Sequence, residues 1–386
     1  IYPTKEQVDY FHKAFGIRRW TWNWGLETYM KSLDEKAKSS YDLQKELNNG
    51  LVKDENYSWL SDVNSMVRQE SLKDLGLSIK RYHDEQRKAR KTTKSIHTDK
   101  YKPKFKSKKK STNSFRYNNK GNPFKPLSKH YFTLTVKKGI KPLKIKSKES
   151  LMFLKDSKFC TITISEKAGK YYVTITYERN NHKFKERKNN FKVGIDMGIK
   201  TPMTCVFENE YGKKKVKKFN LPKNLYKQEK KTERINRIFS RKQVGSSNFN
   251  KIKRRLQRSY IRETNIKKDF REKLTTFLAR NCSNIHIETY SHTSGLNLNI
   301  GRALSRVSGY ELVERLKHKC EEYNVDLKFI PSFTPTTQTC SSCGYKHSNE
   351  NNDKITLSQR SFVCPKCNKK HDRDINAALN ILNYQF

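Results

Sequence analysis

Residues 361–382 read SFVCPKCNKKHDRDINAALNIL, a metal-binding type of Cys-x-x-Cys pair followed directly by an acidic turn that opens into a helix. Asp372 is suited to the N-cap of this helix, where its carboxylate would accept from backbone N–H groups, and Asp374 lies in the first turn. Small side chains at Ala377 and Ala378 would let the helix lie close to a sheet. An apolar stripe is predicted beside them, formed by Ile375, Leu379 and Leu382. The metal pair would then fix where the helix begins.

The pair belongs to a set of four cysteines in two Cys-x-x-Cys motifs with 20 residues between them (344 to 363): Cys340, Cys343, Cys364 and Cys367. Thiolates at this spacing close a tetrahedral Zn²⁺ site and leave no position for a substrate, so we expect a structural zinc ion. Two local disulfides are the alternative. The other four cysteines are scattered singly, which is typical of a reducing, intracellular environment. His347, between the motifs, is not needed as a ligand.

Three carboxylates stand out from the apolar pattern around them. In VGIDMG, strand alternation places Asp196 on the face that carries Gly194 and Gly198. In IHIE, Glu288 ends a short apolar strand, and Asp374 opens the C-terminal helix. Their ordinary alternatives are a strand-end cap, a surface residue and a helix N-terminal acid, in that order. Together, carboxylates from two strand ends and a helix start predict a two-metal site, in which Mg²⁺ ions stabilise the attacking and leaving oxygens of a phosphodiester.

The charge of the chain indicates a polyanionic partner. Lys and Arg number 83 against 38 Asp and Glu, a net charge of +45 in 386 residues. Solvation of single lysine runs does not explain a bias this large, so nucleic acid is the expected partner rather than an acidic small molecule. The chain has no window of 18 apolar residues and no visible signal peptide, so we expect no membrane span. Because it begins at Ile1, we expect residues upstream.

The pattern of the first half changes from helical to extended. Residues 5–95 have helical periodicity, with a capping box at Thr4 and Gln7, and predict a small helical bundle. Residues 96–190 alternate as strands, with a hairpin that turns at residues 167–169. This second segment predicts a barrel-like or curved sheet.

From residue 191 the order strand, strand, helix, strand, helix, strand, helix is typical of an α/β domain. Its long helices, over residues 222–280, carry a basic face that we expect to follow phosphates, made by Lys251, Arg254, Arg255 and Arg258. Two further candidate contacts lie upstream, a polar helix stripe and a basic, aromatic loop. Their residues are Ser65, Gln69 and Lys73 in the stripe, and Lys104, Lys106 and Tyr117 in the loop. Plain solvation of the stripe and a disordered linker are the alternatives.

The acidic motifs and the cysteine-rich end resemble a known family. GIDMGIK, IHIE and DRDINAALNIL resemble the three motifs of the RuvC-type nuclease fold, a ribonuclease-H-like α/β domain. IPSFTPTTQTCSSCG and FVCPKCNKKHDRDINAALNIL are closely similar to the C-terminus of the TnpB family, transposon-encoded RNA-guided DNA endonucleases related to compact type V CRISPR effectors. YPTKEQ and KPKFKSK also resemble that family, so the resemblance covers nearly the whole chain. Two places depart from it: Thr289 stands where Asp is usual, and DFREKLTT where a Leu-His pair is common.

The resemblance implies a multidomain α+β protein with a helical recognition lobe, a barrel-like oligonucleotide-binding wedge domain, and a RuvC-like nuclease domain with an inserted zinc ribbon. The implied boundaries are 1–4 for the start of the wedge domain, 5–95 for the recognition lobe, 96–190 for the wedge domain, 191–335 for the nuclease domain, 336–370 for the zinc ribbon and 371–386 for the last nuclease motif. By motif match, the resemblance implies that Asp196, Glu288 and Asp374 are the catalytic residues and bind Mg²⁺.

Partners and a reaction are implied as well. A guide RNA from the transposon end would direct a monomer of the protein to double-stranded target DNA, beside a short motif that the protein reads. Two Mg²⁺ ions would support hydrolysis of the DNA. We expect such a protein in the prokaryotic cytoplasm, associated with the nucleoid. Two alternatives stay open: a compact type V CRISPR effector, which differs in the source of its guide, and a nuclease-dead RNA-guided repressor, which would have lost an acidic motif residue.

Overall fold

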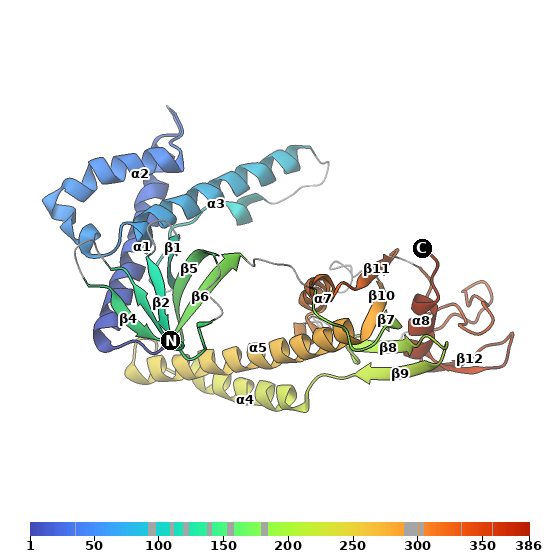
Figure 1. Ribbon diagram of the computed structural model, residues 1–386. Helices are drawn as coiled ribbons and strands as arrows, with labels where there is room; N and C mark the ends of the chain where they lie inside the picture. Colours follow the sequence, from blue (N-terminus) through green and yellow to red (C-terminus); the bar gives the residue numbers. More distant parts are fainter. Residues whose placement is uncertain are drawn as a thin grey trace. The chain divides into compact units, whose positions relative to one another are not determined.

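Figure 1 presents a computed structural model of the chain, which describes residues 1–34, 36–91, 98–108, 112–118, 123–136, 141–152, 158–178, 184–288, 301, 305–332, 334–356 and 358–386. The chain divides into two compact units, Ile1–His182 and Lys183–Phe386. Of the helices in the described ranges, none is both long and apolar enough to cross a membrane. The finer division into six segments stays a prediction.

The first unit begins with a long helix whose start is set by its sequence. Helix α1 (Lys5–Lys31) has the predicted capping box: Thr4 accepts from the backbone N–H of Gln7, and Gln7 accepts from that of Thr4. These reciprocal bonds satisfy donors that a helix start leaves unpaired. The remaining helical elements of the unit are α2 (Ser40–Asn49), η1 (Leu51–Lys53), η2 (Glu55–Asp62), α3 (Met66–Arg90) and η3 (Thr98–Tyr101).

The described strands of the first unit form two antiparallel sheets, ordered β1–β5–β6 and β2–β3–β4. The strands are β1 (Asn113–Asn118), β2 (Phe124–Ser128), β3 (Tyr131–Leu134), β4 (Leu143–Lys146), β5 (Lys158–Lys167) and β6 (Lys170–Glu178). β5 and β6 form the predicted hairpin, and its turn residues Ala168 and Gly169 both have positive φ. The described part of residues 96–190 thus contains two three-stranded sheets, and their barrel-like arrangement stays a prediction.

One hydrophobic core joins the helices and sheets of this unit. Phe11 and Phe15 of α1, Leu72 of α3 and Phe115 of β1 are all buried in it. The ring of Phe115 lies 5.8 Å from that of Phe11 and 5.7 Å from that of Phe15, measured between centroids. Aromatic pairs at this spacing add to the free energy of area burial. The helical and the β segment therefore share one core.

The second unit is built on a five-stranded sheet with the order β11–β10–β7–β8–β9. The strands are β7 (Phe191–Asp196), β8 (Met203–Glu208), β9 (Lys214–Phe219), β10 (Cys282–Glu288) and β11 (Asp326–Ile330). β10 runs parallel to β7 and to β11, whereas β8 is antiparallel to both β7 and β9. The sequence did not predict β9, because its lysine-rich residues are mostly exposed and lack an apolar alternation.

Helices cover both faces of this sheet (Figure 1). They are α5 (Ser247–Asn281) and α7 (Gly309–Tyr323) on one face and α8 (Arg373–Leu382) on the other, whereas α4 (Lys223–Ser240) packs against α5. On one face, Leu274 of α5 and Leu312 of α7 are buried with Val193 and Ile195 of β7. On the other face, α8 packs over β7, β8 and β10. The predicted α/β order is present, with β9 as an addition.

Helix α8 lies so close to β7 that only glycine fits beneath it. A Cβ atom on Gly194 would lie 2.2 Å from the backbone oxygen of Ala378 and 2.5 Å from the backbone nitrogen of Leu382. The buried face of the helix includes Ala377, Ala378, Ile381 and Leu382. The predicted role of the small residues Ala377 and Ala378 is confirmed; of the predicted apolar stripe, Leu382 is buried, and Ile375 and Leu379 are partly buried against the same cluster.

Replacing Gly194 with alanine should destabilise the second unit by about 3 kcal/mol or more, since the new methyl group overlaps backbone that cannot move alone. Chemical denaturation followed by circular dichroism measures the change. Gly16→Ala is the matched control, because a Cβ there meets nothing within 4 Å and α1 should gain up to about 1 kcal/mol. Equal effects of the two substitutions would contradict the close packing of α8.

Candidate metal centres and nucleic-acid contacts

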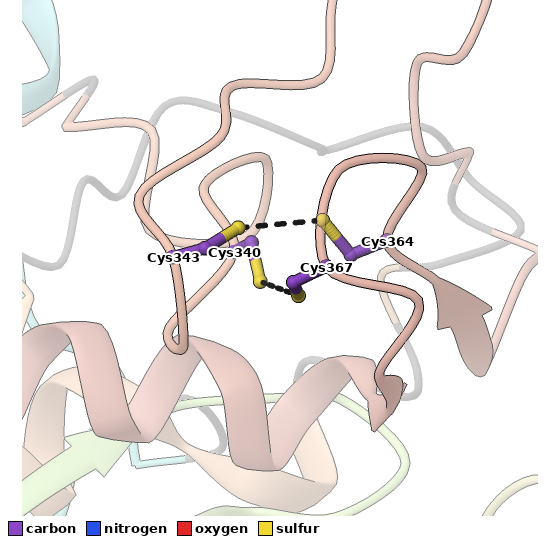
Figure 2. A group of neighbouring side chains, drawn as sticks. All are labelled: Cys340, Cys343, Cys364 and Cys367. Carbon is purple, nitrogen blue, oxygen red and sulfur yellow. Dashed lines mark hydrogen bonds between the residues drawn. The ribbon is translucent and has the colours of Figure 1, made fainter.

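Four cysteine sulfurs gather in the second unit, as Figure 2 shows. The Sγ atoms of Cys340, Cys343, Cys364 and Cys367 all lie within 4.8 Å of one another, and none is in a disulfide. The Cys340–Cys367 and Cys343–Cys364 sulfur distances are 3.8 and 3.6 Å. Thiolates placed tetrahedrally 2.3 Å from a zinc ion would be about 3.8 Å apart. The cluster therefore fits one structural Zn²⁺ ion, and His371 lies just outside it, with Nε2 3.3 Å from Cys340 Sγ.

Two tight turns present these sulfurs. The backbone N–H of Gly344 donates to the carbonyl of Cys340, and that of Asn368 donates to the carbonyl of Cys364, each at 2.9 Å. Gly344 and Asn368 have φ of 74° and 52°, a left-handed conformation that glycine and asparagine tolerate best. Burial raises the pKa of the Cys364 thiol, but backbone N–H groups of the second turn and the neighbouring thiols outweigh it and lower the pKa to about 7, while hydrogen bonds among the same thiols raise the pKa of Cys343. A low pKa favours the thiolate that a metal ion requires.

The second turn leads directly into helix α8. The strands that flank this turn pair antiparallel and are β12 (Ser361–Val363) and β13 (Lys370–Asp372). Asp372 is the N-cap of α8, because its Oδ1 accepts from the backbone N–H groups of Asp374 and Ile375 at 3.1 and 3.0 Å. Its Oδ2 accepts from Lys218 at 2.8 Å. The predicted capping role of Asp372 is confirmed, and the cysteine ribbon is joined to the residue at which α8 begins.

The three predicted acidic residues come from elements that meet at one edge of the sheet. Asp196 ends β7 and Glu288 ends β10. These strands are parallel, and Ile195 is paired with Ile287, so the two acidic residues follow at neighbouring strand ends. Asp374 lies in the first turn of α8, which packs on both strands.

Burial and the charges of the other two carboxylates both act on the carboxyl group of Asp196. Burial, and then the charges of Glu288 and Asp374, raise the pKa of Asp196 from 3.8 to about 7, while Arg373 opposes the rise. In the described part of the chain, the cysteine cluster is the only group of three or more His, Cys, Asp or Glu side chains found close enough together to hold a metal ion. Carboxylate oxygens are the donors that Mg²⁺ prefers, and a divalent cation would relieve the repulsion.

A hydrogen-bond network that the sequence did not predict connects the cysteine ribbon with Glu288. The hydroxyl of Thr336 donates to the Glu288 carboxylate, and the Thr336 carbonyl accepts from Asn380 at 2.7 Å. Asn376, only 1% exposed, accepts from the backbone N–H of Ser341 at 2.8 Å. Ser341 directly follows the first cysteine of the ribbon. Two asparagines four residues apart on a helix that packs against a sheet are the sequence signal that could have revealed this network.

Most of the predicted nucleic-acid contacts lie at the surface. The exposed members are Ser65, Lys73, Lys104, Lys251, Arg254, Arg255 and Arg258, and Gln69 is half-buried. Exposure leaves these contacts possible in geometric terms, and they stay predictions. Thr289, where the sequence departs from the family pattern, lies outside the described residues.

Two residues of the predicted basic loop are held by the core of the first unit. Tyr117 is fully buried, and its hydroxyl lies 2.7 Å from that of Tyr10. Because a ring inside the core cannot stack on a base, the structure contradicts the contact predicted for Tyr117. Lys106 is half-buried, with Nζ 3.1 Å from the centre of the Trp22 ring.

Three family models match the chain. One described as "Cas12f1-like, TNB domain" matches residues 310–381, and two models of the IS605 OrfB family, described as "Probable transposase" and "Helix-turn-helix domain", match residues 174–291 and 1–38. A protein of Streptomyces pristinaespiralis described as "Putative RNA-guided DNA endonuclease" is 29% identical over 390 residues, which cover 99% of this chain and 87% of that protein. "TnpB-like protein L770" of Acanthamoeba polyphaga mimivirus is 30% identical over 248 residues, or 62% of this chain and 45% of that protein.

A solved structure has the same fold. The Cas12f1 chain of a cryo-EM complex with single guide RNA and target DNA matches with a TM-score of 0.52 and 16% identity, over 97% of this chain and 81% of that chain. The structure is thus that of a mixed α+β protein with a Cas12f-like fold and a four-cysteine cluster. Together with the matched sequence models, they show that the chain belongs to the TnpB/IS605 OrfB family.

Cys364→Ser should remove the bound zinc and expose the cysteine ribbon to protease, because three thiolates hold the ion far less tightly than four. Metal content by mass spectrometry and limited proteolysis of the purified chain measure both effects. Cys160→Ser, at an exposed cysteine outside the cluster, should change neither. Full zinc content and unchanged protease resistance in Cys364→Ser would rule out a structural zinc site here.

Asp196→Asn should stabilise the metal-free chain at pH 8 more than at pH 5. The folded state keeps the Asp196 proton up to about pH 7, while the unfolded state loses it near pH 3.8, so stability falls as pH rises through this window. The roughly three-unit rise corresponds to an upper limit of about 4 kcal/mol above pH 7. Thermal midpoints at both pH values measure the effect, and Asp326→Asn, on exposed Asp326 in the same sheet, is the control. A stabilisation independent of pH would contradict the coupling.

Proposed function

We propose that this chain is an RNA-guided DNA endonuclease that cuts target DNA by hydrolysing a phosphodiester bond. The observation that carries the proposal is the coupling of Asp196, Glu288 and Asp374 at one edge of the sheet. Membership of the TnpB/IS605 OrfB family supports it, as does the net charge of +45, which suits two nucleic-acid partners. The role of the cysteine ribbon in cleavage would be structural.

The acidic residues fit Mg²⁺ in charge and donor type. Asp196, Glu288 and Asp374 would hold two ions, which would supply stabilisation of the negative charge on the attacking and leaving oxygens. The remaining contributions come from the protein. Thr336 orients Glu288 through its hydroxyl, and Asp372 fixes the first turn of α8 and with it the backbone of Asp374.

The nucleic-acid partners are proposed to be a guide RNA and a double-stranded target DNA, bound by a protein monomer. The basic face of α5 would follow phosphates, and Ser65, Gln69 and Lys73 would contact the target-adjacent motif. The corresponding segments are a recognition lobe at 5–95, a wedge domain at 1–4 and 96–190, a nuclease domain at 191–335, a zinc ribbon at 336–370 and a last nuclease motif at 371–386.

Two other candidate functions can each be distinguished from the proposed one by one observable feature. A nuclease-dead repressor would lack one of the acidic motif residues, and all three are present here. A compact type V CRISPR effector would carry a guide derived from a repeat array. Sequencing the RNA that copurifies with the protein separates the two sources: a discrete RNA from the transposon end supports the first proposal, and a repeat-derived RNA supports the CRISPR alternative.

Asp374→Asn should lower guided DNA cleavage by more than about a hundredfold, because it removes a carboxylate that would hold the ions that stabilise the negative transition state. Asp372→Asn should lower cleavage by less than about fivefold, because asparagine caps helices well and the exposed pair with Lys218 contributes little. Cleavage of one guided substrate by both variants is measured at several Mg²⁺ concentrations.

Guided DNA binding by Asp374→Asn is the control, and it should be retained, since Asp374 holds ions rather than nucleic acid. If Asp372→Asn is inactive and Asp374→Asn still cuts, the roles of the two residues are reversed. If both cut normally, the proposed site is wrong.

A further inference from the structure

A cavity in the first unit is lined by cations and hydroxyl groups. Its volume is about 110 Å³, several times the roughly 10–15 Å³ that a single water needs. Its lining residues are Phe15, Arg18, Arg19, Lys106, Thr112 and Ser114. Three of the six are positively charged and none is negatively charged. A small polar cavity of this kind suits an anion.

Lys106 is fixed in place at the wall of this cavity. Its backbone N–H donates to the side-chain oxygen of Asn23 at 2.7 Å, and its carbonyl accepts from the side-chain nitrogen of Asn23 at 2.9 Å. Its Nζ lies 3.1 Å from the centre of the Trp22 ring, a cation–π contact. Neither contact supplies a negative charge, so the ammonium group is positioned without being neutralised.

Arg18 and Arg19 differ in their partners. Arg18 is paired with Asp74 at 2.9 Å and donates to the hydroxyl of Ser114 at 2.8 Å. Arg19 donates to the side-chain oxygen of Asn113 at 3.4 Å, and within the described residues it has no carboxylate partner. The Nε of Arg18 is buried and, in the same described ranges, has no hydrogen-bond partner. Donors are therefore in excess around the cavity.

The carboxylates nearest to the cavity are occupied by other groups. Asp74 also pairs with Arg116, at 2.5 Å, and Glu70 accepts from Arg116 at 2.8 Å. Glu166 accepts from Asn113 at 3.0 Å and lies 3.7 Å from His12. Within the described residues, Arg19 and Lys106 thus have no ion-pair partner of their own.

The lowered pKa values of Lys106 and Arg19 show the electrostatic cost of this arrangement. Burial, and then the charge of Arg18, lower the pKa of Lys106 to about 7, although Asp74 acts in the opposite direction. Burial also lowers the pKa of Arg19. An anion placed between these groups would favour their charged forms, because opposite charges in a partly dehydrated site attract strongly.

We propose that this cavity binds one phosphodiester group of a nucleic-acid backbone, with Arg19 and Lys106 donating to its oxygens and Ser114 held in place by Arg18. A phosphodiester carries one negative charge and acceptor oxygens that match converging donors. The proposal deepens the proposed function, because it rests on nucleic acid being the partner. The group can belong to RNA or to DNA.

The test measures binding of a fluorescent 20-nucleotide RNA and a fluorescent 20-base-pair DNA duplex by anisotropy, over a series of salt concentrations. Arg19→Gln and Lys106→Met should each weaken binding about tenfold in the arm whose phosphate occupies the cavity. They should also reduce the salt slope by roughly 0.7 for the RNA or 0.9 for the duplex, as expected for one lost phosphate contact. The arm that responds identifies the source.

Lys31→Gln is the matched control, since it also removes one positive charge from this unit but at an exposed side chain paired with Glu27. It should change affinity less than twofold. If neither cavity variant weakens either arm more than Lys31→Gln does, the proposal is wrong.

A second measurement covers the case in which Lys106→Met disturbs the packing against Trp22. Inorganic phosphate should raise the thermal midpoint of the unchanged chain above that in chloride at equal ionic strength, and Arg19→Gln should abolish the rise. An equal rise in both proteins would overturn the proposal. Neither measurement depends on cleavage. Phosphate binding in the cavity without guided DNA cleavage would therefore refute the proposed endonuclease function alone. Guided cleavage together with unaltered nucleic-acid affinities of the cavity variants would refute the phosphate site alone.

Discussion

Helix α8 can lie on the sheet only because Gly194 has no side chain. A single Cβ atom there would lie 2.2 Å from the backbone of the helix, so the two elements touch main chain to main chain. This contact sets the distance between the acidic residues, because Asp196 follows Gly194 by two residues on β7 and Asp374 precedes Ala378 by about one helical turn. The glycine beside the acidic strand end therefore makes room for the helix that brings the third carboxylate.

Because the acidic side chains repel one another, contacts with other parts of the protein must hold them close together. Helix α8 is fixed at its start by the cysteine ribbon, through β13 and the Asp372 cap, and along its face by Asn376 and Asn380. The same ribbon segment carries Thr336, whose hydroxyl reaches Glu288. One structural metal site would thus position two of the three acidic residues against the third. This explains why a metal ribbon directly precedes an acidic helix in the sequence.

Local patterns allowed much of this structure to be predicted. The capping box at Thr4, the hairpin around Gly169, the four-cysteine cluster and the cap at Asp372 all depend on residues close in sequence. Exposed β9 was missed because its lysine-rich sequence lacks an apolar alternation, and the burial of Tyr117 against Tyr10 was missed because it depends on a contact between residues far apart in sequence. The acidic residues were found by their departure from apolar patterns. Asn376 and Asn380 had a local signal, their four-residue spacing on a helix, whereas Thr336 acts through a contact with Glu288 that no local pattern reveals.

The most direct test is whether the zinc site positions the acidic residues. Mn²⁺ takes the same oxygen ligands as Mg²⁺ and can be followed by electron paramagnetic resonance, so its binding is titrated on the zinc-loaded chain and on Cys364→Ser. Asp196→Asn identifies the signal that comes from the acidic site. If the ribbon places Asp374 and Glu288, Mn²⁺ binding at that site should weaken at least about tenfold in Cys364→Ser. Equal Mn²⁺ affinities with and without zinc would contradict this arrangement.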